Sequence, residues 1–168
     1  MGAVYLFPGM LFAEPGEHEV STVLGSCIAV CLWDARRRIG GMNHFLLPLW
    51  NGEGLASPRY GNVAIGKLLE RMRELGCRPA ALQAKVFGGG TMVQTGGGLW
   101  NIGERNAMVA KDLLEEAGIP VVGRDVGGAQ SRRIRFLTAT GEVFLKRLAQ
   151  LPRAGYERRP PIERVTGR

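Results

Sequence analysis

The fold is decided by residues 28–47, which read IAVCLWDARRRIGGMNHFLL. Ile28 to Trp33 is an apolar run of strand length that contains β-branched residues, and Ile39 to Leu47 is a second such run. The polar residues between them, Asp34 to Arg38, predict a turn. The two strands are therefore expected to pair as an antiparallel hairpin.

This hairpin is expected to bring a thiol and an imidazole together. If Ala35 and Arg36 form a two-residue turn, Cys27 lies directly opposite His44, with Cβ atoms about 4.5–5.5 Å apart. A longer turn or a bulge would shift the register by one or two residues and would still leave the pair close. A neighbouring imidazole lowers the pKa of a thiol and shuttles its proton, so the two side chains are candidates for a nucleophile and its base.

The residues just before Cys27 suit the same chemistry. Gly25 allows the backbone N–H groups of Ser26 and Cys27 to point at one spot, which is what an oxyanion site requires. The hydroxyl of Ser21 or of Thr22 would orient the imidazole. The competing interpretation is structural, because cysteine is among the most buried residue types and often fills a core.

The other two cysteines favour a structural interpretation. Cys31 lies inside an apolar run and Cys77 follows a predicted helix. An odd cysteine count without an export signal argues against disulfides and indicates reduced thiols in the cytoplasm. The spacing of the cysteines and histidines does not match a zinc site, so no metal is expected.

Length and charge limit the other classes of function. A chain of 168 residues suits one domain, and we expect it to span residues 1–149, followed by a basic, flexible tail at 150–168. The formal net charge of +7 includes +3 from that tail, and no basic stripe with interleaved aromatic residues indicates nucleic-acid binding. No window is apolar enough for membrane insertion. The glycine clusters match no phosphate-binding loop, so turns and close packing explain them better.

The remaining patterns predict a mixed architecture. An amphipathic helix is expected over 58–75, with Ser57 as its cap, and a second over 103–117, with Asn101 as its cap. Further strands are expected at 81–87, 119–125, 132–138 and 142–148. Because strands and helices do not alternate strictly, we predict an α+β layered sandwich and not a doubly wound parallel sheet.

Several motifs together resemble the CheD family of chemoreceptor glutamine deamidases. They are LGSCIAVCLWD (24–34), GGMNHFLLP (40–48), AKVFGGG (84–90), NIGERNAMVAKDLLEEAGI (101–119), DVGG (125–128) and TGEV (140–143). The resemblance implies a three-layer α/β/β sandwich similar to the deamidase domain of the cytotoxic necrotizing factor toxins. It also implies a protein-glutamine glutaminase that converts particular receptor glutamines to glutamate in bacterial chemotaxis, with receptor methylesterase activity as a related reaction.

The resemblance also assigns residues and partners. The family's cysteine corresponds to Cys27 and its histidine to His44. Its threonine corresponds by ungapped match to Ser21, whereas Thr22 keeps the residue type, so the orienting hydroxyl stays open between the two. The implied partners are the cytoplasmic helices of chemoreceptors and a CheC phosphatase. The alternative is therefore a non-catalytic regulatory module that binds a CheC-type phosphatase.

Overall fold

The computed structural model describes residues 1–91 and 101–149. The tail predicted at 150–168 and the glycine cluster at 96–98 lie outside the described residues. No helix in the described ranges is long and apolar enough to cross a membrane.

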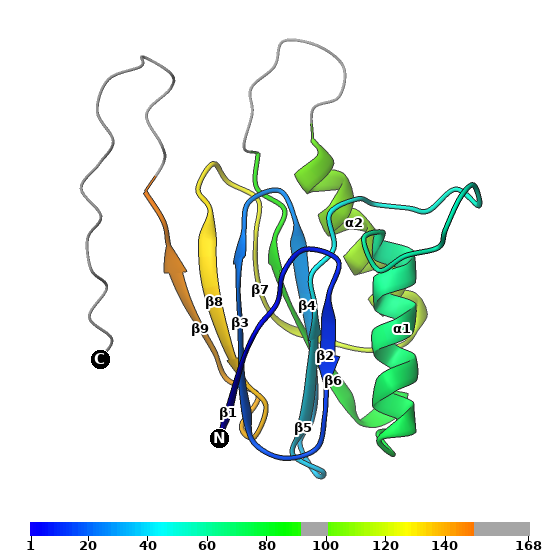
Figure 1. Cartoon of the computed structure of the whole chain (residues 1–168), viewed down its shortest axis with the longest axis vertical. Helices are drawn as coiled ribbons and strands as arrows, with labels where there is room; N and C mark the ends of the chain where they lie inside the picture. Colours follow the sequence, from blue (N-terminus) through cyan, green and yellow to red (C-terminus); the bar gives the residue numbers. More distant parts are fainter. Residues whose placement is uncertain (92–100, 150–168) are drawn as a thin grey trace.

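The described chain folds into two sheets and two α-helices (Figure 1). One sheet has four strands in the order β1-β3-β8-β9, and the other has five in the order β2-β5-β4-β6-β7. The strands are β1 Gly2–Tyr5, β2 Leu11–Ala13, β3 His18–Leu24, β4 Ile28–Asp34, β5 Ile39–Asn43, β6 Leu82–Gly88, β7 Val121–Val126, β8 Arg132–Leu137 and β9 Val143–Arg147. The helices are α1 Gly61–Glu74 and α2 Ile102–Glu116, with a 3-10 turn at Pro79–Ala81. The mixed α/β class predicted from the sequence is confirmed.

The elements form three layers, with the five-stranded sheet in the middle (Figure 1). Alternate residues of β4 face opposite sides of this sheet. Ile28, Val30 and Leu32 pack in one apolar cluster with both helices. Ala29 and Cys31 pack in a second cluster with the four-stranded sheet. Strand β4 is thus buried on both faces, which explains its unbroken apolar sequence.

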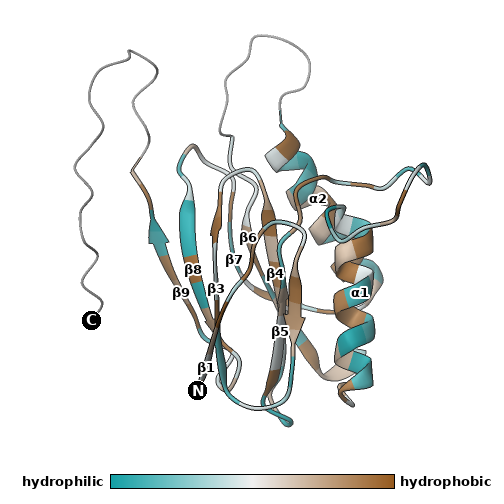
Figure 2. Cartoon of the chain, in the orientation of Figure 1, coloured by the Kyte–Doolittle hydropathy of each residue, from teal (hydrophilic) through white to brown (hydrophobic). Residues whose placement is uncertain are grey.

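The helices match their expected amphipathic character, and both carry hydrophobic and hydrophilic residues along their length (Figure 2). Helix α1 begins at Gly61, three residues later than predicted, and Ser57 does not cap it. Before that point the backbone is engaged elsewhere, because the Arg59 carbonyl accepts hydrogen bonds from the N–H groups of Leu46 and Leu47. Asn101 is the N-cap residue of α2, but its side chain makes no capping hydrogen bond.

The predicted hairpin exists, but its predicted register is wrong. Strand β4 pairs with β5 so that Asp34 lies opposite Ile39. The turn therefore contains four residues and not two. Asp34 Oδ1 accepts hydrogen bonds from the N–H groups of Arg36 and Arg37, each at 3.0 Å, and Arg38 adopts a left-handed φ of 53°. This side-chain capping stabilises the longer turn, and it moves Cys27 away from the position directly opposite His44.

Candidate active site

Cys27 and His44 share one face of the central sheet. The backbones of Ile28 and Phe45 exchange two hydrogen bonds of 3.0 and 2.9 Å, so these two residues are a directly opposed pair. Leu46 consequently stands opposite Cys27, and His44 is its diagonal neighbour on the same face, at a typical Cα separation of about 7–8 Å. That face looks toward the four-stranded sheet, where Cys27 packs against the inter-sheet cluster.

The imidazole of His44 is held from the opposite sheet by Thr22. Thr22 is a fully buried residue of β3, and its Oγ1 lies 2.7 Å from His44 Nδ1 and 2.7 Å from the carbonyl oxygen of Leu6. A carbonyl only accepts, so the single hydroxyl proton of Thr22 is donated to Leu6. Thr22 Oγ1 must then accept from Nδ1–H, which leaves the lone pair on Nε2. This is the tautomer in which Nε2 can receive a proton.

Ser21 does not share this position. The strand β3 alternates, with Val20, Thr22 and Leu24 fully buried between the sheets and Ser21 on the other face. The sequence left the orienting hydroxyl open between two neighbours, and the geometry brings only that of Thr22 to the imidazole.

Nε2 of His44 is buried and has no hydrogen-bond partner among the described residues. Cys27 and His44 therefore form no hydrogen bond with each other in this state. Desolvation lowers the pKa of His44 to about 4 and raises the pKa of the Cys27 thiol above its ordinary value. In this state the imidazole makes no hydrogen bond to the thiol, and burial sets the direction of the thiol pKa shift. Both groups are neutral near pH 7.

The loop before Cys27 is anchored through its carbonyl groups. The carbonyl of Gly25 accepts from Gly90 N–H at 2.9 Å, and the carbonyl of Cys27 accepts from Gly89 N–H at 2.8 Å. The carbonyl of Ser26 accepts from Asn106 Nδ2 at 3.0 Å. Neither Ser26 nor Cys27 donates its N–H to another described residue. These two N–H groups are therefore available to a ligand.

Sequence reasoning missed two contributors to this arrangement. One is the Leu6 carbonyl, which no residue type could have revealed. The other is Asn106, a fully buried polar residue of α2. Its signal was present in the sequence, because it lies on the helix face that also carries Ala110 and Leu114, where an apolar residue is expected.

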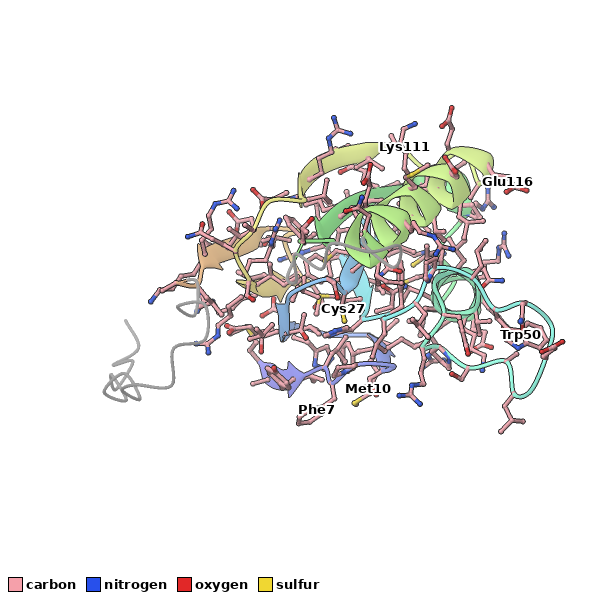
Figure 3. All side chains as sticks on the ribbon, turned by 90° about the horizontal axis from the view of Figure 1, so that it is seen from above. Phe7, Met10, Cys27, Trp50, Lys111 and Glu116 are labelled. Carbon is pink, nitrogen blue, oxygen red and sulfur yellow. The ribbon has the colours of Figure 1, made fainter. Side chains whose placement is uncertain are left out.

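An apolar stretch of the N-terminal segment lies beside the site. Figure 3 shows Cys27 between the segment that carries Phe7 and Met10 and helix α2. Phe7 and Met10 are exposed. Their turn is fixed to the histidine strand, because Gly9 N–H donates to the carbonyl of His44 and His44 N–H donates to the carbonyl of Met10. Exposed apolar side chains next to a reactive group are typical of a surface that receives a polypeptide.

The other cysteines are placed as predicted for structural residues. Cys31 and Cys77 are each 2% exposed, and all three cysteines are free. In the ranges 1–91 and 101–149, no three His, Cys, Asp or Glu side chains are grouped so that they could hold a metal ion.

Comparison with known proteins places the chain in a family. Residues 46–147 match the family described as CheD chemotactic sensory transduction. The chain belongs to the CheD family. A relative from Trichlorobacter lovleyi, named a probable chemoreceptor glutamine deamidase CheD, is 52% identical over 143 residues, which cover 85% of this chain and 89% of the relative. A relative of the same name from Sulfurimonas denitrificans is 44% identical over 146 residues, covering 84% and 92%.

The alignment with the Trichlorobacter lovleyi relative includes Cys27 and His44. The family match begins at Leu46, after Cys27 and His44. An aligned stretch of 143 residues in a chain of 168 can leave out at most 25 residues at one end, so it must include both positions. Among solved structures, the protein YfiH of Bacillus licheniformis aligns with a TM-score of 0.40 at 15% identity, covering 67% of this chain and 49% of its own. A likeness of this degree carries no argument about fold or function.

Proposed function

We propose that this chain hydrolyses the side-chain amide of particular glutamines on chemoreceptors to glutamate, with Cys27 as nucleophile and His44 as base. The observation that carries the proposal is the Thr22–His44 contact of 2.7 Å, which sets the imidazole tautomer. Membership of the CheD family and the names of its relatives support the substrate.

The acylation step follows from the neutral state of both groups. As the sulfur of Cys27 attacks the glutamine carboxamide carbon, its proton passes to Nε2 of His44. The N–H groups of Ser26 and Cys27 hold the oxygen that becomes negative. The tetrahedral intermediate collapses when the C–N bond breaks and the protonated imidazole gives its proton to the leaving ammonia. A thioester to Cys27 remains.

The deacylation step reverses the roles with water in place of the thiol. His44 takes a proton from water as the oxygen attacks the thioester carbon, and the same N–H groups hold the second oxyanion. The C–S bond then breaks and the sulfur of Cys27 takes the proton back from His44. Thr22 keeps Nδ1 protonated in both steps and stabilises the imidazolium. Neither step uses a metal ion or a cofactor.

The proposal is tested by incubating a receptor cytoplasmic fragment with the wild-type chain and with a Cys27→Ala variant. We expect only the wild type to produce the small mass increase that accompanies each conversion of amide to carboxylate, located by peptide mass spectrometry. A Cys31→Ala variant controls for loss of a thiol elsewhere, because Cys31 is buried in the inter-sheet cluster. Equal conversion by wild type and Cys27→Ala would refute the enzyme; binding of the fragment without any conversion would favour a regulatory binding module.

Three finer points stay predictions. Hydrolysis of receptor methyl esters would use the same acyl-enzyme chemistry, with methanol leaving in place of ammonia. Binding of a CheC-type phosphatase and similarity to the deamidase domain of cytotoxic necrotizing factors rest on the family resemblance. Each can be measured separately from glutamine conversion, with esterified receptor, with purified phosphatase and with superposed structures.

A further inference from the structure

Asn106 joins the two segments that carry the reactive groups. Its side-chain Nδ2 donates to the carbonyl of Ser26 at 3.0 Å and to the carbonyl of Leu46 at 2.9 Å. Ser26 precedes Cys27, and Leu46 stands opposite Cys27 in the hairpin register. One amide group on a helix therefore fixes the start of β4 relative to the end of the histidine segment. With two carbonyls as acceptors, both protons of the NH2 group are used and the amide cannot be flipped.

Fixing the direction of the Ser26 carbonyl also fixes the direction of the N–H group of Cys27. A trans peptide is planar, so the carbonyl of one residue and the N–H of the next point in opposite directions. The structure contains no cis peptide bond in the described ranges. Because Asn106 holds the Ser26 carbonyl toward helix α2, the N–H of Cys27 points away from that helix. The contact that holds the Ser26 carbonyl therefore also fixes the direction of the Cys27 N–H.

Helix α2 packs tightly enough against the neighbouring backbone to hold Asn106 in a fixed position. A Cβ added at Gly103 would lie 2.3 Å from the carbonyl oxygen of Gly90 and 2.6 Å from that of Gly89. The first turn of α2 is therefore in backbone contact with the glycine run that holds the carbonyls of Gly25 and Cys27. Asn106 lies one turn further along the same helix, fully buried.

We infer that Asn106 is a positioning residue for the oxyanion site: through the Ser26 carbonyl it fixes the direction of the Cys27 N–H. The inference rests on the proposed acyl-transfer function and adds to it a residue that touches neither substrate nor thiol. It predicts a selective defect. Reactions at Cys27 that pass through an oxyanion slow down, and reactions that only need the thiolate do not.

Two small-molecule reagents distinguish reactions that form an oxyanion from reactions that need only the thiolate, and neither requires a receptor. p-Nitrophenyl acetate acylates the thiol through a tetrahedral oxyanion, and release of nitrophenolate reports its rate. Iodoacetamide alkylates the same thiol by displacement at carbon, with no oxyanion. In an Asn106→Ala variant we expect acylation of Cys27 to fall about tenfold to hundredfold, while the rate of alkylation and its pH profile stay unchanged. Mass spectrometry of the modified peptides assigns each adduct.

The chain carries its own reporters of unfolding. Cys31 and Cys77 are buried, so their alkylation would reveal a loosened structure. A Leu114→Ala variant is the matched control, because Leu114 is a fully buried residue of the same helix that lies two turns beyond Asn106 in the apolar cluster. We expect it to lower stability and to leave the ratio of acylation to alkylation at the wild-type value.

The outcomes are decisive in either direction. Unchanged acylation in Asn106→Ala, or equal losses of acylation and alkylation, would overturn the inference. Alkylation of Cys31 or Cys77 in Asn106→Ala would show that this variant is loosened. The Asn106→Leu variant, which keeps most of the side-chain volume, then replaces it in the comparison of acylation with alkylation. If the buried cysteines react in both variants, Asn106 is a structural residue only. A wild type that reacts with both probes but leaves receptor glutamines unchanged would refute the proposed substrate and not the role of Asn106.

Discussion

At the scale of single residues, the hydroxyl proton of Thr22 determines the tautomer of His44. Because that proton is donated to the Leu6 carbonyl, the hydroxyl oxygen can only accept from His44. The imidazole is thereby held in one tautomer and one orientation without a carboxylate. Burial lowers the pKa of His44 and the neutral hydroxyl does not offset this, so the imidazole is unprotonated at neutral pH and Nε2 is free to accept a proton.

A Thr22→Val variant keeps the shape of the side chain and removes the acceptor for Nδ1–H. We expect kcat for glutamine conversion to fall about tenfold to hundredfold, because the imidazole can then rotate or change tautomer. The matched control is Ser21→Ala, on the other face of β3. Steady-state rates on receptor fragment measure both, and an equal loss in the two variants would contradict the assignment of Thr22.

Stability should depend on pH through His44. Burial lowers its pKa to about 4 in the fold, against an ordinary value of 6.5, so below pH 6.5 the unfolded chain binds a proton that the fold excludes. This contribution is fully present above pH 6.5 and is lost as the pH falls toward 4. Between pH 7 and pH 5 we expect a loss of about 2 kcal/mol in the free energy of unfolding.

Urea denaturation of the wild type and of a His44→Gln variant at the two pH values measures this loss. The variant lacks the titrating group, so its free energy of unfolding should decrease less over the same interval. Identical decreases would show that other groups cause the pH dependence.

The residue types of the site could be read from the sequence, but their contacts could not. Cys27, His44 and Thr22 were all candidates, because a thiol can act as a nucleophile, an imidazole as its base and a hydroxyl as the group that orients the imidazole. Choosing Thr22 over Ser21 requires knowing which residues of β3 face the other sheet, and β3 was not among the predicted strands. Its alternation of Val20, Thr22 and Leu24 was visible as a period of two. The Leu6 carbonyl carries no side-chain signal.

At the scale of elements, helix α2 and the glycine run after β6 are fitted to each other. Gly88 and Gly89 have φ of 108° and 65°, and a Cβ on Gly88 would lie 2.1 Å from the carbonyl oxygen of Cys27. Glycine is needed here because the backbone must approach the cysteine loop directly. The sequence indicated close packing at these glycines, which is confirmed, although it did not indicate what they pack against.

Alanine in place of glycine should therefore have opposite effects in the two helices. Gly66 lies in α1 with open space around its Cα, so Gly66→Ala should stabilise the chain by about 0.5–1 kcal/mol. Gly103→Ala should destabilise it by about 1–3 kcal/mol, because the added methyl overlaps backbone atoms of Gly89 and Gly90. Chemical denaturation measures both, and a stabilising Gly103→Ala would show that α2 can shift without cost.

The hairpin shows why register is hard to predict at this scale. Both strands were found from their apolar runs, whereas the pairing depended on the length of one turn. Asp34 accepts two backbone N–H groups of the turn, and Arg38 takes a left-handed φ, so the turn has four residues. An even shift of two residues kept Cys27 and His44 on one face, because side chains alternate with a period of two.

At the scale of the whole molecule, a buried cation joins the two sheets. Arg132 of β8 has a side chain 1% exposed, and its Nη1 lies 2.5 Å from Asp125 Oδ1 on β7. The guanidinium also donates to the carbonyls of Asp125 and Gly127. Arg147 contacts the same carboxylate with a side chain 50% exposed. A buried charge needs such partners, because desolvating it alone is costly.

Removing the carboxylate should leave the buried cation uncompensated. We expect Asp125→Ala to lower the free energy of unfolding by about 2 kcal/mol, since Asp125 itself is partly exposed to screening solvent. Arg147→Met, which breaks only the more exposed ion pair, should cost less than about 1 kcal/mol. Urea denaturation of both variants tests the ranking, and a reversed order would place the important contact at Arg147.

The contact between Thr22 and His44 spans the two sheets, and this decides how the site could be moved to another protein. A designer who copied the hairpin alone would transfer a thiol and an imidazole with no fixed tautomer. The smallest transferable unit is discontinuous and takes backbone or side-chain groups from both sheets and one helix, at Leu6, Thr22, Gly25–Cys27, His44–Leu46, Gly88–Gly90 and Asn106. A scaffold for this chemistry must therefore be chosen for the spacing of its layers before any residue is grafted onto it.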